Sequence, residues 1–164
     1  MIDKTFPIAE KLVNNSNTLT AQLHQLLLDE AECLKHGAPI DTLNALVAKK
    51  QPIITEINQF SRQLSQILTV ENLPNNQSGV QEYFDKAQIT GLATETIRRQ
   101  WSEITRNAKA CQRLNEQNGA VIDMLQRHTQ RSLNILKGKP LVADTYGKDG
   151  SAKTARYSRE LISV

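Results

Sequence analysis

The longest run of regularly spaced apolar residues lies in the segment 101–138. Steps of four and three residues connect a series of mostly apolar positions: Ile97, Trp101, Ile104, Ala108, Cys111, Asn115, Asn118, Ile122, Leu125, Thr129, Ser132 and Leu136. This spacing predicts one long amphipathic helix with a heptad-like apolar stripe. Two asparagines, Asn115 and Asn118, occupy the centre of the stripe, and Gly119 follows where a helix prefers almost any other residue.

Two earlier segments have the same periodicity. Residues 3–36 predict a first helix, with Asp3 as N-cap and with Gly37 and Pro39 as stop signals. Its stripe consists of Leu12, Leu19, Leu23, Leu26, Leu27, Cys33 and Leu34, interrupted by Ser16 and Glu30. Because the connection to the next segment is short, the two helices should be antiparallel neighbours.

The second predicted helix covers residues 40–69 and has Asp41 as its expected N-cap. Its apolar face comprises Leu43, Leu46, Val47, Ile53, Ile54, Ile57, Phe60, Leu64, Ile67 and Leu68. Pro52 lies in its interior, where we expect a bend and not a break, because the stripe resumes in phase. The basic residues Lys49, Lys50 and Arg62 should lie on its polar side.

Turn-forming residues fill positions 70–79, which predicts a surface loop. A short third helix over residues 80–87 could place Val80 and Phe84 over one end of the bundle. Thr94 is a candidate cap for the long helix. The predicted fold is therefore all-α: an elongated antiparallel helical bundle of three long helices plus one short helix, with a flexible C-terminal tail.

The lengths of these helices leave part of the stripe without a partner. At about 1.5 Å per residue, the first two helices span about 45–50 Å and the long helix about 70 Å. The long helix should therefore bend at Gly119 or leave part of its apolar stripe open. An open stripe needs another partner, either a foreign helix or a second copy of the chain.

Charge separates the body from the tail and predicts two regions, a helical bundle domain over 1–138 and a basic tail over 139–164. Residues 137–164 contain six basic and three acidic side chains, while the preceding part carries fourteen of each sign. A basic tail can favour nucleic acid. Without interleaved aromatic residues, however, three net charges are better explained by solubility than by specific nucleic-acid binding.

The sequence contains none of the common catalytic or cofactor-binding motifs. It has no P-loop, dinucleotide-binding glycine motif, HExxH motif or nucleophile elbow. His24, His36 and His128 lack metal-ligand spacing, and Cys33 and Cys111 fit buried, reduced thiols. We therefore expect no enzyme, cofactor or metal site. No signal peptide and no apolar run of about 18 residues is present, so we expect a cytoplasmic protein without membrane insertion.

The polar centre of the long helix has two explanations that the residues leave open. Asn115 and Asn118 can fix the register of helices inside the monomer, as buried asparagines do in coiled coils. Alternatively, together with Gly119, they can belong to a surface that recognises another helix.

Three motifs resemble the flagellar export chaperones of the FlgN type. The segment Arg113-Leu-Asn-Glu-Gln-Asn-Gly119, preceded by Trp101 and followed by Leu136, resembles the "LN-x-x-NG" helix of that family. Tyr146-Gly-Lys-Asp-Gly150 resembles its "YG-x-DG" element, just after the long helix. Lys49, Lys50 and Arg62 match a "K-x-x-L(L)…L-x-x-R" pattern, from which this sequence departs by carrying Pro52 in the same helix.

This resemblance implies a chaperone of type III flagellar export that holds the C-terminal amphipathic helices of hook-filament junction proteins. It would prevent their premature assembly and deliver them to the export gate, with its ATPase complex as a further partner. The implied client-binding residues are Asn115, Asn118, Gly119, Ile122, Leu125, Thr129, Leu133 and Leu136. The implied gate-docking residues are Tyr146, Gly147, Asp149 and Gly150.

A competing interpretation is a coiled-coil structural or adaptor protein that only self-associates. The open stripe would then be the seam of a homodimer, and no export client would bind it. Sedimentation in the presence of a client peptide separates the two interpretations.

Overall fold

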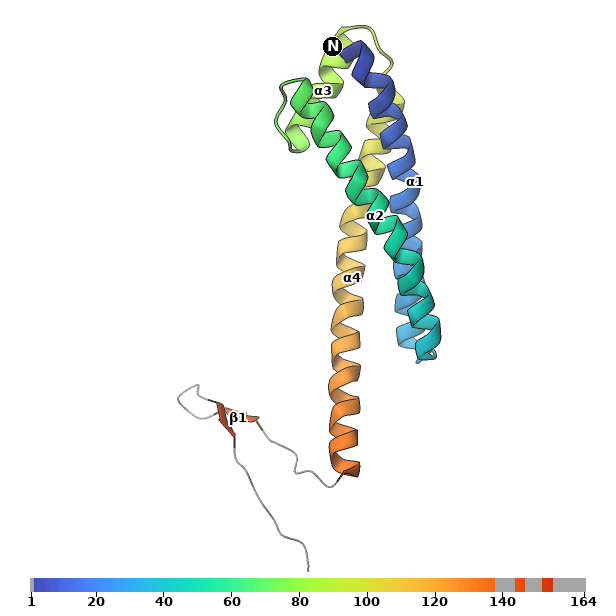
Figure 1. Cartoon of the computed structure of the whole chain (residues 1–164), viewed down its shortest axis with the longest axis vertical. Helices are drawn as coiled ribbons and strands as arrows, with labels where there is room; N and C mark the ends of the chain where they lie inside the picture. Colours follow the sequence, from blue (N-terminus) through green and yellow to red (C-terminus); the bar gives the residue numbers. More distant parts are fainter. Residues whose placement is uncertain (1, 138–143, 147–151, 155–164) are drawn as a thin grey trace, which may run out of the picture. The chain divides into compact units, whose positions relative to one another are not determined.

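A computed structural model describes residues 2–137, 144–146 and 152–154, and it divides into two units between Asn118 and Gly119. The first unit contains the helices α1 (Ile2–Lys35), α2 (Ile40–Val70) and α3 (Gln77–Ile89), together with the first part of α4 (Glu95–Leu136). The predicted helical bundle of three long helices and one short helix is confirmed (Figure 1).

The second unit contains the remainder of α4 and two short strands, β1 (Asp144–Tyr146) and β2 (Ala152–Thr154). The strands pair in antiparallel register, with Tyr146 opposite Ala152. This pairing lies in the region for which the sequence predicted a tail without strands. The predicted flexibility of that tail concerns mostly residues outside the described part of the chain.

The turn between α1 and α2 forms at the predicted glycine. Gly37 has a positive φ of 65°, a conformation that glycine adopts without steric cost. The Ala38 amide donates to the Cys33 carbonyl oxygen at 2.9 Å, which closes the end of α1. The chain then returns along α1, so that α1 and α2 are antiparallel neighbours (Figure 1).

Both predicted N-caps in the first two helices are wrong. Helix α1 begins at Ile2, so Asp3 lies within its first turn. The N-cap of α2 is Pro39, and no side chain caps it, while Asp41 again lies in the first turn. A carboxylate in a first turn still interacts favourably with the positive end of the helix dipole, which explains why sequence signals place these residues near the helix starts.

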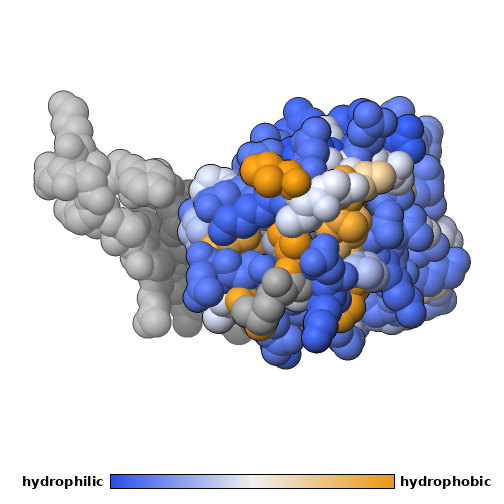
Figure 2. All heavy atoms as spheres, turned by 90° about the horizontal axis from the view of Figure 1, so that it is seen from above, coloured by the Kyte–Doolittle hydropathy of each residue, from blue (hydrophilic) through white to orange (hydrophobic). Residues whose placement is uncertain are grey.

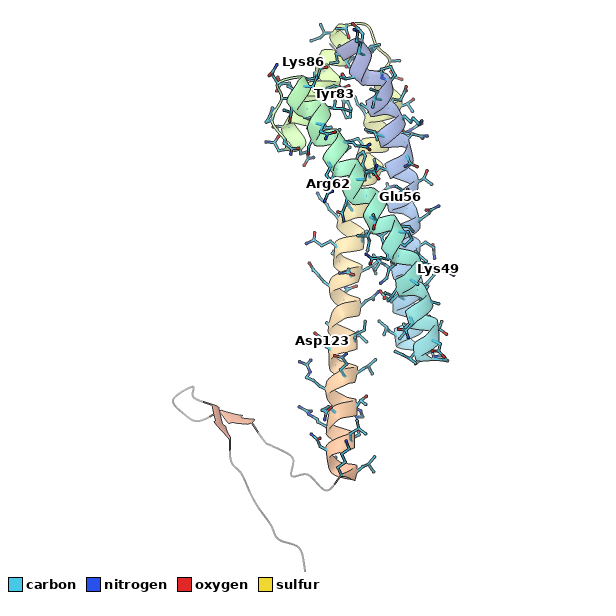
Figure 3. The ribbon with its side chains drawn as sticks, viewed as in Figure 1. Lys49, Glu56, Arg62, Tyr83, Lys86 and Asp123 are labelled. Carbon is cyan, nitrogen blue, oxygen red and sulfur yellow. The ribbon has the colours of Figure 1, made fainter. Side chains whose placement is uncertain are left out.

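Helix α2 continues through Pro52, which is exposed and therefore lies on the outer side of the helix. The buried apolar residues of α2 are Leu46, Phe60, Leu64, Ile67 and Leu68. Val47 and Ile54, which were predicted on the apolar face, are instead 51% and 38% exposed. Lys49, Glu56 and Arg62 are exposed along α2 (Figure 3).

A hydrophobic cluster of the first unit lies at the end where α3 packs with α1, α2 and α4. It contains Ile2, Phe6, Ala9, Val13, Phe60, Leu64, Ile67, Leu68, Leu73, Val80, Tyr83, Phe84, Ala87, Ile97 and Ile104. The burial of Val80 and Phe84 confirms their predicted position over one end of the bundle. Viewed from this end, apolar side chains also reach the surface among hydrophilic ones (Figure 2).

Polar bonds fix this end of the bundle. The Tyr83 hydroxyl donates to Thr5 Oγ1 at 3.1 Å, and the Thr5 hydroxyl donates to Glu71 Oε1 at 2.7 Å. Burial raises the pKa of the Tyr83 phenol, which therefore remains a neutral hydrogen-bond donor at neutral pH. One chain of hydrogen bonds thus connects α3, α1 and the residue that follows α2.

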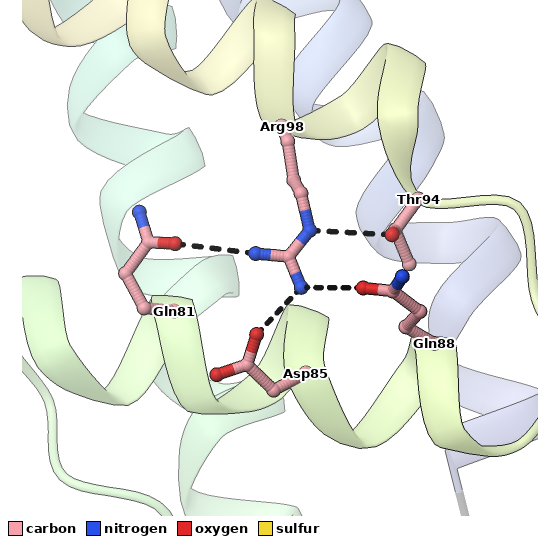
Figure 4. A network of polar contacts seen from close by, with 5 residues as sticks. All are labelled: Gln81, Asp85, Gln88, Thr94 and Arg98. Atoms are coloured by element: carbon pink, nitrogen blue, oxygen red, sulfur yellow. Dashed lines mark hydrogen bonds and ion pairs between the residues drawn. The ribbon is translucent and has the colours of Figure 1, made fainter.

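Arg98, in the first turn of α4, connects this helix to α3 (Figure 4). Its guanidinium forms a 2.7 Å ion pair with Asp85 and longer bonds with Gln81 and Gln88, and its Nε donates to Thr94 Oγ1. Thr94 immediately precedes α4, as predicted for a cap, and its carbonyl accepts the Arg98 amide at 3.0 Å.

The start of α3 requires glycine at position 79. Asn76 caps the helix by accepting the Gly79 amide at 3.0 Å, and this brings the helix start against the preceding loop. A Cβ atom on Gly79 would lie 1.8 Å from the Pro74 carbonyl oxygen. The loop backbone would have to move to accommodate any side chain.

Gly79→Ala should lower the free energy of unfolding by about 1–3 kcal/mol, the usual cost of overpacking. Urea denaturation followed by circular dichroism measures this change. Gln77→Ala, at an exposed position in the same turn, should change the free energy by less than about 0.5 kcal/mol. Equal stability of the two variants would contradict the close approach at Gly79.

Candidate functional site on the long helix

The buried side of α4 follows a strict interval of seven residues. Its buried residues are Ile97, Ile104, Cys111 and Asn118, and Trp101 packs partly buried against the cluster. This is the heptad spacing expected of a helix that packs along its neighbours. The next residue of the series, Leu125, is 45% exposed, so the buried series ends at Asn118.

Asn118 connects three helices of the first unit. Its Nδ2 donates to the Leu27 carbonyl oxygen at 3.0 Å and to Glu30 Oε2 at 2.9 Å, both on α1. The other carboxylate oxygen of Glu30 accepts from Lys50 Nζ of α2 at 2.5 Å. The Glu30 and Lys50 side chains are only 4% and 12% exposed. Asn118 therefore fixes the register of α4 against α1 and α2.

This arrangement corrects the predicted position of Lys50 and decides between the two explanations given for Asn118. Lys50 does not lie on the polar outer side of α2, because it turns inward to the Glu30 carboxylate. Asn118 acts as a register lock within the monomer, and both protons of its amide are already donated. Among the predicted client-binding residues it is the one whose side chain is enclosed.

Asn115 and Gly119 have different surroundings from Asn118. The Asn115 side chain is exposed. A Cβ atom on Gly119 would meet no atom within 4 Å, so no backbone approaches closely there, and α4 continues through this glycine. Neither residue takes part in the contacts that hold Asn118.

The part of α4 after Gly119 presents exposed apolar side chains. Ile122, Leu125, Leu133 and Leu136 are 36%, 45%, 40% and 82% exposed. Together with the exposed Thr129, they recur at intervals of three and four residues and therefore share one face of the helix. We call these five residues the α4 stripe. The stripe contains five of the eight predicted client-binding residues.

Two further exposed residues were missing from the predicted site. Met124 and Ile135 are 56% and 60% exposed and, being eleven residues apart, share a side of α4 away from the stripe. The polar positions of this part of α4 include three basic residues, Arg127, Arg131 and Lys137. They include one carboxylate, Asp123 (Figure 3). This part of the helix is thus apolar on more than one side and carries a net positive charge.

Both cysteines are free thiols, Cys33 partly buried and Cys111 buried. Cys111 is buried, its sulfur lies 3.9 Å from the Thr20 carbonyl oxygen, and burial raises the pKa of the thiol. Within the described ranges no group of three or more histidine, cysteine, aspartate or glutamate side chains could hold a metal ion. Nor is any helix in these ranges long and apolar enough to cross a membrane.

The family model described as FlgN protein matches residues 5–154 of the chain. The chain belongs to the FlgN family. FlgN proteins are flagellar export chaperones, and this membership confirms the resemblance found in the sequence. A search of curated proteins and a search of solved structures each gave no match.

The FlgN match extends across the element that resembles "YG-x-DG". Of the predicted gate-docking residues, Tyr146 ends strand β1, while Gly147, Asp149 and Gly150 lie outside the described residues. Gate docking by this element remains a prediction.

Proposed function

We propose that this FlgN-family chain binds the C-terminal amphipathic helix of a hook-filament junction protein on the α4 stripe. The observation that carries the proposal is the exposure of four large aliphatic side chains along one helix face. A client helix with a matching apolar face would cover them. Its own assembly face would then be unavailable for premature polymerisation in the cytoplasm, where we place this step.

The energetics fit a complex that forms and is later released. Burying a leucine or isoleucine side chain contributes about 1.5–3 kcal/mol. Four such residues on each partner must offset an association cost of about 4–15 kcal/mol. A dissociation constant in the micromolar range, about −8 kcal/mol, is consistent with these terms. Such affinity suits a chaperone that hands its client to another protein.

Delivery requires a second contact, for which we propose Tyr146, Gly147, Asp149 and Gly150. The support is the resemblance of this segment to the "YG-x-DG" element of the FlgN family. In this proposal the segment docks on the flagellar export gate, with the export ATPase complex as a further partner, while the α4 stripe holds the client.

Leu125→Asp and Leu133→Asp should each weaken binding of a junction-protein C-terminal peptide at least tenfold, because each places a carboxylate within the apolar contact. Isothermal titration calorimetry measures the affinity, and circular dichroism verifies folding. Gln130→Asp adds the same charge at an exposed polar position of the same helix and should change affinity less than about twofold.

Normal binding by both folded stripe variants would reject the α4 stripe as the client site. Sedimentation of the wild-type chain at micromolar concentration addresses self-association. A dimer that ignores the client peptide, and that becomes monomeric in the stripe variants, would favour the homodimer seam.

Tyr146→Ala should leave client affinity unchanged and weaken binding to the cytoplasmic domain of the export gate at least tenfold, if the tyrosine ring is the anchor of that contact. Surface plasmon resonance with the loaded chaperone measures this binding. Tyr157→Ala is the matched control. Equal affinity of the wild type and the Tyr146 variant would reject the docking role.

A further inference from the structure

The first unit contains a second surface that the proposed function does not use. A hollow of about 420 Å³ lies between α2 and α4 and reaches the start of α3, and a hollow of about 350 Å³ lies between α3 and α4. The two hollows share four lining residues: Gln77, Trp101, Thr105 and Lys109. We call this joined surface the Trp101 groove. Every residue that lines it precedes Asn118.

The wall of the larger hollow is apolar where it meets the hydrophobic cluster. Leu64 and Leu68 of α2, Val80 of α3 and Ile104 of α4 line it. Trp101 stands between the two hollows, with its ring centroid 6.5 Å from that of Phe60 and 6.4 Å from that of Phe84. These aromatic neighbours hold the indole in place. The groove can therefore receive apolar side chains on a preformed surface.

The indole N–H of Trp101 is an unsatisfied polar group beside the groove. Trp101 Nε1 is buried and has no hydrogen-bond partner among the described residues. A buried donor without an acceptor is unfavourable, and native structures contain few of them. Trp101 therefore combines an unsatisfied donor with a ring that lines both hollows.

The charged side chains that line the groove are all positive. Its lining includes Arg98, Arg106 and Lys109 and contains no carboxylate side chain. Arg98 is engaged by Asp85, whereas Arg106 and Lys109 take part in none of the ion pairs of the described residues. Both are exposed. Carboxylates on an occupant would find two available cations here.

We propose that the Trp101 groove docks an acidic amphipathic helix of a partner protein. Its apolar side chains would enter the hollow between α2 and α4, and its carboxylates would face Arg106 and Lys109. The lining residues of α4 extend from Arg98 to Gln112, about 21 Å at 1.5 Å per residue, which matches about four helical turns. The apolar wall favours a peptide over a nucleic acid, whose phosphates would gain nothing from leucine and isoleucine side chains.

Trp101 is the one tryptophan of the chain, so its fluorescence reports on this groove. The probe is a synthetic helical peptide of about four turns with leucines at intervals of three and four, glutamates elsewhere and no tryptophan. Titration into the full chain should give a saturable change in emission. A peptide of the same pattern with lysine in place of glutamate should give none.

Charge reversal locates the binding. The double variant Arg106→Glu/Lys109→Glu should weaken binding of the acidic peptide at least tenfold. The control Arg99→Glu/Arg113→Glu makes the same charge change on α4 outside the groove and should weaken binding less than threefold. Leu125→Asp should have no effect on this titration, which keeps the result independent of the proposed client site.

Four results would overturn the proposal. The first is the absence of a saturable signal, and the second is equal weakening by both charge-reversal pairs. The third is a concentration-dependent dimer, without peptide, that Ala108→Arg within the groove abolishes, because the groove would then be a self-association surface. An oligonucleotide that competes equally with the acidic peptide would likewise assign the groove to phosphate and overturn it.

Discussion

Replacing Glu30 by alanine should lower the free energy of unfolding by about 3–5 kcal/mol, the cost of leaving one member of a buried ion pair without its partner. The Lys50 ammonium would remain largely buried, and Asn118 would lose one of its two acceptors. Urea denaturation followed by circular dichroism measures the change. The urea concentration at the midpoint of unfolding should fall. The slope of the free energy of unfolding against urea concentration should stay the same, because the surface exposed on unfolding is nearly the same.

Two further variants make this expectation specific. Glu32→Ala removes an exposed carboxylate of the same helix, paired only with exposed Lys35 and His36, and should cost less than about 1 kcal/mol. In Glu30→Leu/Lys50→Met both charges are replaced by apolar groups, so stability should recover toward the wild type. If Glu30→Ala were as stable as Glu32→Ala, the pair would contribute nothing to the fold.

Replacing Phe84 by alanine should lower the free energy of unfolding by about 3–5 kcal/mol, the range for emptying a buried aromatic site. The Phe84 ring is 1% exposed and lies between Tyr83 and Trp101, with centroids 6.1 Å and 6.4 Å away. The Arg98 guanidinium stands 5.6 Å over the same ring. The substitution would therefore weaken the contact between α3 and α4 as well as leave a cavity.

Thermal unfolding followed by Trp101 emission measures this loss, since the indole adjoins the emptied site. Phe84→Leu refills part of the volume and should cost less than half as much. Ile89→Ala, at a residue of the same helix that is 85% exposed, should change stability by less than about 0.5 kcal/mol. A Phe84→Ala variant as stable as Ile89→Ala would show that α3 is not needed to close the bundle.

Periodicity predicted the helices well because each long helix buries a regularly spaced series of side chains over at least part of its length. The ends of α1 and α2 lie within one residue of the predicted ends. Helix α4 ends two residues before 138 and begins directly after the candidate cap Thr94, six residues before the segment 101–138, and α3 is longer than predicted at both ends. Lys50 was placed wrongly, since a lysine beside other polar residues has the pattern of a solvated face. Its buried partner, Glu30, lies on a different helix, and only the tertiary fold brings the two together.

The α4 stripe could be anticipated because the first two helices are shorter than the fourth. The residues could not indicate which half of α4 would stay exposed, and the family resemblance supplied that choice. Met124 and Ile135 were missed because a search along one stripe ignores the other faces. The Trp101 groove was missed because its walls come from three separate segments. The sequence signal available for this groove was the pair Arg106 and Lys109, which lie on the same helix as the one tryptophan.

The end of the buried heptad at Asn118 also bears on how such a chaperone can change over generations. The buried residues of α4, from Ile97 to Asn118, are constrained by packing, because a substitution there alters the stability of the bundle. Side chains of the stripe are exposed and contribute little to that stability. If the α4 stripe binds the client as proposed, a mutation at Leu125 or Leu133 would alter the choice of client with little penalty to the fold. Under that proposal, the capacity to fold and the capacity to acquire a new specificity reside in separate stretches of one helix.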